Sequence, residues 1–210
     1  MSDVLCIGCV CYDVNIPLEV FPEENTKTGV HTLYEEGGGP AANAAYLLSK
    51  WEAGCALAGL VGNDLYGNRI AAEFRSVNTD ISLLEIRDNY PTQLSVVLVN
   101  KCNGSRTIIY RRQPESRVKI NETAVMGIKP KVLLFDGFEH EAAIDAIKMF
   151  PDAITILDAG SLRKGVEMLA DKVDYLAASE RFALSYTGLH RIESVGDMEY
   201  CIRKLYELNG

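Results

Sequence analysis

The stretch of the sequence best suited to holding a ligand is a run of three glycines that leads directly into small, helix-forming residues. Residues 37–47 read GGGPAANAAYL. Glycine accepts any φ and leaves its backbone N–H groups uncovered, and a helix that starts behind the glycines adds a partial positive charge. Glycine content alone is equally compatible with a ligand-binding turn and with a tight strand-to-helix turn that binds nothing.

Three carboxylates follow apolar runs that we expect to be buried strands: Asp13, Asp136 and Asp158. In an open parallel sheet, the carboxyl ends of the strands line the ligand crevice. Each aspartate on its own could begin a turn or cap the next helix. Together at one edge, facing the glycine turn, they favour a site for the vicinal hydroxyl groups of a polyol such as a sugar.

Buried strands alternate with helices along most of the chain. This alternation is typical of an α/β, Rossmann-like fold with an open, mainly parallel sheet flanked by helices. Short apolar runs predict the strands, and apolar residues at helical spacing predict the helices. The expected strands are 4–10, 55–61, 132–135, 154–157 and 175–178, and the expected helices are 41–51, 66–76, 142–150, 164–170 and 198–208.

Two segments interrupt this alternation. Residues 93–99 and 107–110 read as strands around Asn103-Gly104, a strong β-hairpin signal, and residues 13–35 look irregular. We expect the hairpin to stand off the main sheet and to cover a site. The expected division is an α/β core over 1–12, 36–90 and 113–210, with a small β lid over 13–35 and 91–112.

Composition limits the partners and the compartment. The net charge of −8 and the pI near 5.0 argue against a nucleic-acid partner, which requires clustered Lys and Arg. No apolar stretch is long enough to span a bilayer, and the first residues enter a strand pattern without a basic flank, so we expect a cytoplasmic protein with no membrane partner. The six cysteines lie mostly in apolar runs, which favours buried, reduced thiols over a metal site.

Three features together resemble the PfkB, ribokinase-like family of carbohydrate kinases. They are the early strand leading to Asp13, the turn over 38–43 (GGPAAN), and the segment 59–67 (GLVGNDLYG). The resemblance implies a ribokinase-like sheet with a small β lid. It also implies ATP-dependent phosphorylation of a hydroxyl on a small-molecule sugar or nucleoside, with Mg²⁺ as the metal cofactor.

The resemblance also assigns residues to the substrate. Asp13 would bind sugar hydroxyls, Gly38 and Gly39 would contact the sugar through their backbone, and Asn43 would hydrogen-bond it from the first helical turn. Asp136 stands where the family often places a further substrate-side residue. Arg111 and Arg112 leave the lid, where they either meet a substrate anion or form a solvated strand end.

The chain departs from the family pattern in two places. Residues 179–182 read SERF where the family usually has Asn-x-x-Glu, a motif tied to Mg²⁺ and phosphate. The Gly-Ala-Gly-Asp turn, which supplies the family's anion hole and catalytic base, does not occur in the sequence. We therefore expect no catalytic residue in this chain. We also expect it to be the C-terminally truncated, N-terminal two-thirds of a kinase, ending in a helix with Asp197 as N-cap and Asn209-Gly210 as stop.

Two other functions stay open. The chain could bind sugars without catalysis, or form a homodimer through the lid, because an exposed edge strand such as 93–99 readily pairs with another chain. A dinucleotide-dependent enzyme is less favoured, because the glycine turn does not directly follow the first strand.

Overall fold

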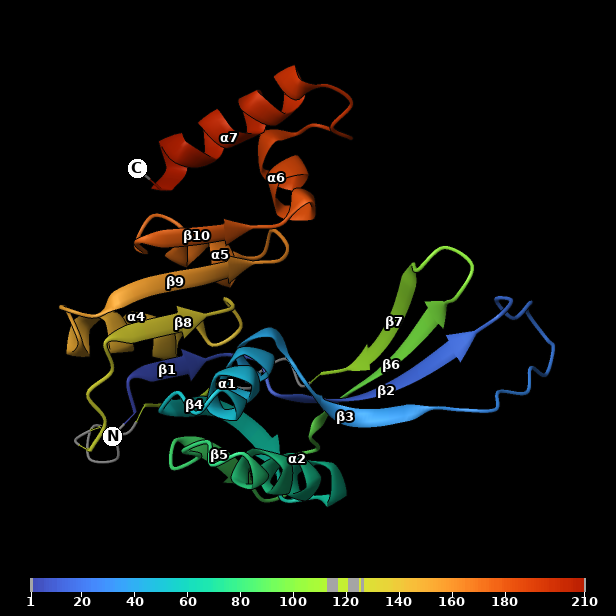
Figure 1. Ribbon diagram of the computed structural model, residues 1–210, viewed down its shortest axis with the longest axis horizontal. Helices are drawn as coiled ribbons and strands as arrows, with labels where there is room; N and C mark the ends of the chain where they lie inside the picture. Colours follow the sequence, from blue (N-terminus) through green and yellow to red (C-terminus); the bar gives the residue numbers. More distant parts are fainter. Residues whose placement is uncertain (1, 113–116, 121–124, 126, 210) are drawn as a thin grey trace.

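The chain forms two sheets, and helices flank the larger one (Figure 1). The computed structural model describes residues 2–112, 117–120, 125 and 127–209. The larger sheet has six strands, all parallel, in the order β10-β9-β8-β1-β4-β5. This confirms the predicted α/β fold. The strands are β1 (Val4–Ile7), β4 (Cys55–Gly62), β5 (Leu84–Arg87), β8 (Val132–Phe135), β9 (Ile154–Ala159) and β10 (Tyr175–Ala178).

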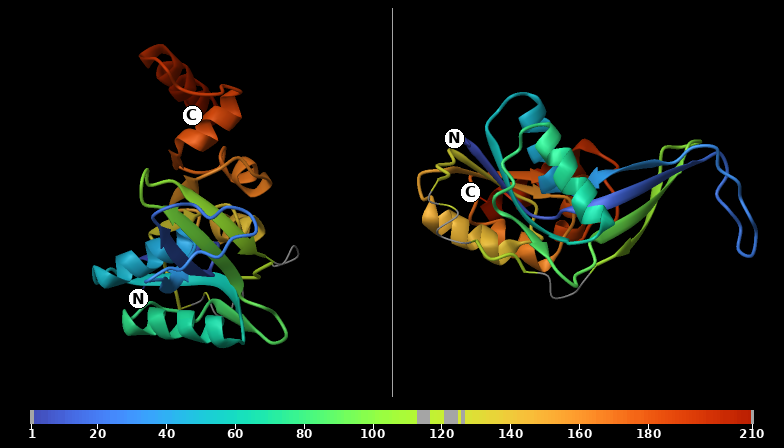
Figure 2. Two further views of the ribbon diagram at one scale, coloured as in Figure 1. Left: turned by 90° about the vertical axis from the view of Figure 1, so that its right-hand side faces the viewer. Right: turned by 90° about the horizontal axis from the view of Figure 1, so that it is seen from below.

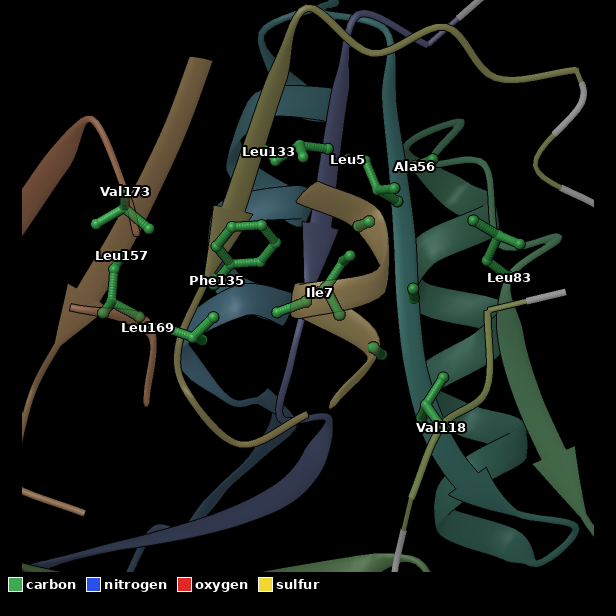
Figure 3. Close-up of a cluster of buried hydrophobic side chains, with 14 of the residues drawn as sticks. Leu5, Ile7, Ala56, Leu83, Val118, Leu133, Phe135, Leu157, Leu169 and Val173 are labelled. Atoms are coloured by element: carbon green, nitrogen blue, oxygen red, sulfur yellow. The ribbon is translucent and has the colours of Figure 1, made fainter. Parts of the chain in front are cut away.

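Helices cover both faces of this sheet, as the view from below shows (Figure 2). Helices α1 (Pro40–Lys50) and α2 (Leu65–Ser76) pack on one face, and α4 (His140–Met149) and α5 (Lys164–Leu169) pack on the other. Successive strand residues alternate between the faces, as expected for a pleated strand. Within β1, Cys6 joins the cluster under α1 and α2, whereas Leu5 and Ile7 join the cluster under α4 and α5 (Figure 3).

The second sheet has four strands and extends away from the core (Figure 1). Its order is β3-β2-β6-β7, and β6 and β7 form the predicted antiparallel hairpin. Gly104 closes the hairpin with a φ of 72°, and its N–H donates to the carbonyl of Asn100 at 2.8 Å. The strands are β2 (Cys11–Leu18), β3 (Tyr34–Gly38), β6 (Gln93–Asn100) and β7 (Arg106–Arg111).

The chain passes from one sheet to the other earlier than predicted. The first core strand ends at Ile7, and Asp13 lies inside β2 of the second sheet. The prediction that Asp13 ends the first core strand is therefore wrong. The apolar run continues through residues 8–12 because the junction itself is buried, so the hydrophobic pattern contains no break.

Other elements were also missed. Residues 13–35, predicted to be irregular, contain most of β2 and the start of β3. Strand β3 is exposed and acidic at its start, so it lacks the apolar alternation that marks a strand. Strand β5 and helix α6 (Glu180–Thr187) were not predicted.

The final helix, α7 (Val195–Asn209), begins before the predicted N-cap. The Ser194 hydroxyl accepts from the Asp197 N–H at 3.2 Å, and the Asp197 carboxylate accepts from the Ser194 N–H at 2.9 Å, which is a capping box. Ser194 therefore takes the place that was predicted for Asp197. Gly210, the other half of the predicted stop, and residues 113–116, which begin the last predicted core segment, lie outside the described residues.

Within the described residues, no helix has the length and apolar character needed to cross a membrane. All six cysteines are free thiols, and Cys102 alone is exposed.

Candidate functional site

The glycine turn forms the passage from β3 into α1. Gly39 has a φ of 106°, which side-chain-bearing residues rarely adopt. A Cβ at Gly39 would lie 2.2 Å from the carbonyl oxygen of Cys9, so the backbones of the two segments touch directly. Pro40 then begins the helix, where its missing N–H costs nothing and its fixed φ fits.

Asp13 lies directly against this turn. A Cβ at Gly38 would lie 2.2 Å from Asp13 Oδ2, so the carboxylate occupies the space that a side chain would need. Cys11 in β2 pairs with Gly38 in β3, and its thiol donates to Asp13 Oδ1 at 3.3 Å. Asp13 is half-buried, so its carboxylate has acceptor capacity left for a ligand hydroxyl.

Asn43 lies next to the glycine turn. Its backbone N–H donates to the Gly39 carbonyl at 2.8 Å, in the first turn of α1. Its side chain is exposed, and no hydrogen bond joins its amide to another described residue. The structure thus brings Asp13, Gly38, Gly39 and Asn43 together where the two sheets meet.

Asp136 lies behind this group and is fully buried. Its Oδ2 accepts from the N–H groups of Cys9 at 2.8 Å and Ala41 at 3.2 Å, and its Oδ1 accepts from the N–H of Phe138 at 3.0 Å. A Cβ at Gly8 would lie 2.2 Å from Asp136 Oδ1. One carboxylate therefore ties the end of β8 to the junction of β1 and β2 and to the first turn of α1.

Burial raises the pKa of Asp136, although its three backbone hydrogen bonds and the charge of Arg163 act in the opposite direction. Because its acceptor capacity is largely used by the backbone, the geometry gives Asp136 a positioning role. Direct contact between Asp136 and a substrate stays a prediction.

Asp158 lies near the C-terminal end of β9, at the same edge of the sheet. It is half-buried, and this burial raises the pKa of its carboxyl while the charge of Arg163 lowers it. Asp158 and Asp136 are thus both within the electrostatic reach of Arg163, a residue that the sequence reasoning did not single out.

The segment 59–67 links α2 to the second sheet. Asp64 caps α2 by accepting from the Gly67 N–H at 2.9 Å. Its carboxylate also accepts from the Thr92 N–H at 2.9 Å and the Thr92 hydroxyl at 2.6 Å, while Thr92 Oγ1 accepts from the Gly62 N–H at 2.9 Å. These residues position the start of β6. The sequence reasoning missed Thr92, which lies 28 residues from the cap and has no local signal.

Two arginines meet one aromatic ring at this edge. The guanidinium carbon of Arg112 lies 4.4 Å, and that of Arg163 3.9 Å, from the ring centroid of Phe138. The neighbouring Arg111 donates to the Thr92 carbonyl at 3.0 Å, so the end of β7 is attached to the start of β6. Phe138 and Arg163 carry no sequence signal of their own, because only the fold brings them to Arg112.

The segment that replaces the family's Asn-x-x-Glu motif has a structural role. The Ser179 hydroxyl accepts from the Phe182 N–H at 3.0 Å and donates to the Gly160 carbonyl at 3.0 Å, which caps α6. Within the described residues, no three His, Cys, Asp or Glu side chains converge to hold a metal ion.

Comparison with known proteins assigns the sequence to one family. Residues 1–137 match the pfkB family carbohydrate kinase model. Ketohexokinase of Mus musculus is 33% identical over 108 residues, which are 51% of this chain and 36% of that protein. The match thus spans about a third of that relative.

Solved structures agree with the fold over nearly the whole chain. The ribokinase of Giardia lamblia superimposes with a TM-score of 0.79 at 16% identity, covering 100% of this chain and 67% of its own. The ribokinase of Arabidopsis thaliana, solved with ribose and ATP, gives 0.78 at 20% identity, covering 100% and 70%. The chain therefore belongs to the pfkB family of carbohydrate kinases and has the ribokinase-like fold.

Proposed function

We propose that the chain carries the sugar-binding half of an ATP-dependent kinase that transfers the γ-phosphoryl group to a sugar hydroxyl. The observation that carries this proposal is the contact of the half-buried Asp13 carboxylate with Gly38, beside Gly39 and the first turn of α1, which carries Asn43. Family membership supports the reaction class. The fold shared with a ribokinase solved with ribose and ATP supports the choice of ligands.

Each group in the site has a task that fits a polyol. The Asp13 carboxylate accepts hydrogen bonds from hydroxyls, and the Asn43 amide both donates and accepts. Gly38 leaves room for the Asp13 carboxylate and Gly39 for the Cys9 carbonyl, so the two glycines let these groups lie directly against the turn. Together they would fix the acceptor hydroxyl in line with the phosphoryl group that ATP supplies, and positioning is a major part of the catalysis of phosphoryl transfer.

The proposed half-site lacks a catalytic base. The sequence contains no Gly-Ala-Gly-Asp turn, and Asp136 is fully buried with its carboxylate bonded to the backbone. We therefore propose that turnover needs residues beyond these 210, and that this chain alone binds the acceptor without phosphorylating it.

A coupled assay of ATP consumption with a panel of sugars tests this proposal, with saturation-transfer NMR to detect bound sugar. We expect sugar signals that depend on the protein and no turnover above the blank. Clear turnover by the 210-residue chain would contradict the half-site. An absence of binding to every sugar by the folded protein would contradict the whole proposal.

Association through the second sheet is a second candidate role. The prediction that residues 93–99 form an exposed edge strand is wrong, because β6 lies between β2 and β7. The edge strand is β7, where Ile109 and Tyr110 are 63% and 69% exposed. Sedimentation velocity of the wild type and of an Ile109→Lys variant tests it. A concentration-dependent dimer that the variant loses would support this role, and a wild-type monomer at all concentrations would exclude it.

A further inference from the structure

Helix α7 lies beyond strand β10, at the end of the larger sheet that points away from the second sheet (Figure 1). One side of this helix is fixed to the core. Cys201 is buried there, and Leu205 and Leu208 pack against the main hydrophobic cluster. At the end of the helix, the Asn209 amide donates to the Val173 carbonyl at 2.7 Å. These contacts fix the orientation of the helix, and with it the direction in which its outer side faces.

The outer side of α7 carries a second apolar stripe, and this stripe is exposed. Its members are three or four residues apart, which places them on one face of a helix. Each of them is at least 51% exposed, and they are Val195, Met198, Ile202 and Tyr206. The neighbouring β10 is the last strand of its sheet, so within the described residues no further element covers this end of the molecule.

Such a stripe differs from the single apolar residues that are common on protein surfaces. Adjacent apolar side chains on one exposed helix face indicate a contact with another macromolecule. Covering them removes apolar surface from water, which lowers the free energy. A helix that is anchored by one stripe and exposes another is suited to pack against a second helix.

Two residues of opposite charge lie on the same flank of the exposed stripe, one helical turn apart. They are Glu199 and Arg203, and both are exposed. Within the described residues, neither of them forms an ion pair. If two copies of α7 lie antiparallel about a two-fold axis near Ile202, Glu199 of each copy faces Arg203 of the other. The stripe and its charged flank are therefore complementary to themselves.

We propose that the chain forms a symmetric dimer in which the exposed stripe of α7 packs antiparallel against the same stripe of a second copy. The apolar side chains form the centre of this interface, and two Glu199–Arg203 pairs form its polar rim. The charge pattern favours a second copy as the occupant, because the same two side chains supply both halves of each ion pair. The interface involves neither the second sheet nor the glycine turn, so the inference does not rest on the proposed function.

Sedimentation velocity of the wild type at increasing concentration tests the inference. We expect a reversible monomer–dimer equilibrium with a Kd of about 1–100 μM, because a single helix pair is a small interface. Ile202→Glu places two carboxylates at the two-fold axis and should weaken the dimer at least about tenfold. Leu47→Glu makes the same kind of change at an exposed residue of α1 and should leave the Kd unchanged. Melting temperatures measured on the monomers verify that the variants fold.

Charge reversal tests the antiparallel arrangement itself. Glu199→Arg and Arg203→Glu each bring like charges together across the axis, and each should weaken the dimer about 3- to 30-fold. The double variant has opposite charges again and should recover most of the lost affinity. The effect of each single variant should decrease as salt is added. An ion pair within one helix would change the melting temperature of the monomer but not the Kd of the dimer.

Three outcomes would overturn the inference. A wild type that stays monomeric at every concentration would exclude the dimer. A dimer that Ile202→Glu leaves intact, but Ile109→Lys dissociates, would belong to the second sheet. A double charge variant that recovers no affinity would refute the antiparallel pairing. All these α7 variants should bind the sugar panel as the wild type does, so a failure of the dimer stays distinct from a failure of the proposed function.

Discussion

Asp136 shows how one buried carboxylate can position the segments that form a site. It has no exposed surface, and it receives N–H groups from residues 9, 41 and 138, which belong to three separate segments. Gly8 must be glycine because the carboxylate occupies the place of its Cβ. In the same way, the Asp13 carboxylate occupies the place of a Cβ at Gly38, but Asp13 is only half-buried.

Asp136→Asn should destabilise the protein. The amide oxygen can keep part of the network, but the amide nitrogen would place a donor against backbone donors. We expect a loss of about 1–3 kcal/mol in the free energy of unfolding, measured by urea denaturation. Asp158→Asn changes a half-buried carboxylate near the C-terminal end of β9, and its free energy of unfolding should fall clearly less. Equal losses in the two variants would contradict the assigned role of Asp136.

The connections between helix α2 and the second sheet explain why residues 59–67 matter. Asp64 joins the N-terminus of α2 to Thr92 at the start of β6. Glu73, later in the same helix, accepts from the Gly37 N–H at 2.9 Å in β3, and Arg69 donates to the Tyr12 hydroxyl at 2.9 Å in β2. One helix of the core thus holds three strands of the other sheet.

Asp64 should also contribute to the pH dependence of stability. Burial raises the pKa of its carboxyl, but the hydrogen bonds from Gly67 and Thr92 outweigh this, and the pKa is lowered on balance. The unfolded chain then takes up the proton first as the pH falls. The stabilisation is complete above the ordinary aspartate pKa of about 3.9 and is lost as the pH falls through the lower folded value.

Urea denaturation of wild type and Asp64→Asn between pH 6 and pH 3 measures this effect. The wild type should be more stable at pH 6, and the difference between the two proteins should shrink toward pH 3. Asp145→Asn, an exposed aspartate on α4, controls for the loss of a carboxylate. A difference that is constant, or that grows on acidification, would contradict the cap.

Sequence patterns predicted the elements whose signals are local. The parallel core strands have continuous apolar runs, and the Asn103-Gly104 dipeptide marks the β6–β7 hairpin. Strand β3 was missed because residues 34–36 are exposed and its register with β2 is set by tertiary pairing. Asp13 was assigned to the wrong strand because a buried sheet junction looks, in sequence, like an unbroken strand.

Some residues of the candidate site could be predicted from the sequence and others could not, again because only local signals can be recognised. The glycine turn and Asn43 are close in sequence, so a family motif could identify them together. Phe138 and Arg163 have no such motif. Their meeting with Arg112 depends on the order of β7, β8 and β9 in space, which no local pattern encodes.

The whole molecule consists of a layered core and a second sheet that leaves it at one edge (Figures 1 and 2). Both polar clusters, the group around the glycine turn and the two arginines beside Phe138, lie where the two parts meet.

The central claim is that Asp13 and the glycine turn bind a sugar. Titration calorimetry of the wild type and of Asp13→Asn against the sugar panel tests it most directly. Asp152→Asn is the matched control, because Asp152 is exposed and precedes β9, at the other end of the strands from the site. We predict a sugar that binds the wild type and the control equally, and Asp13→Asn at least about tenfold more weakly, with unchanged melting temperatures. Equal binding by Asp13→Asn, or no sugar bound by the folded wild type, would contradict the claim.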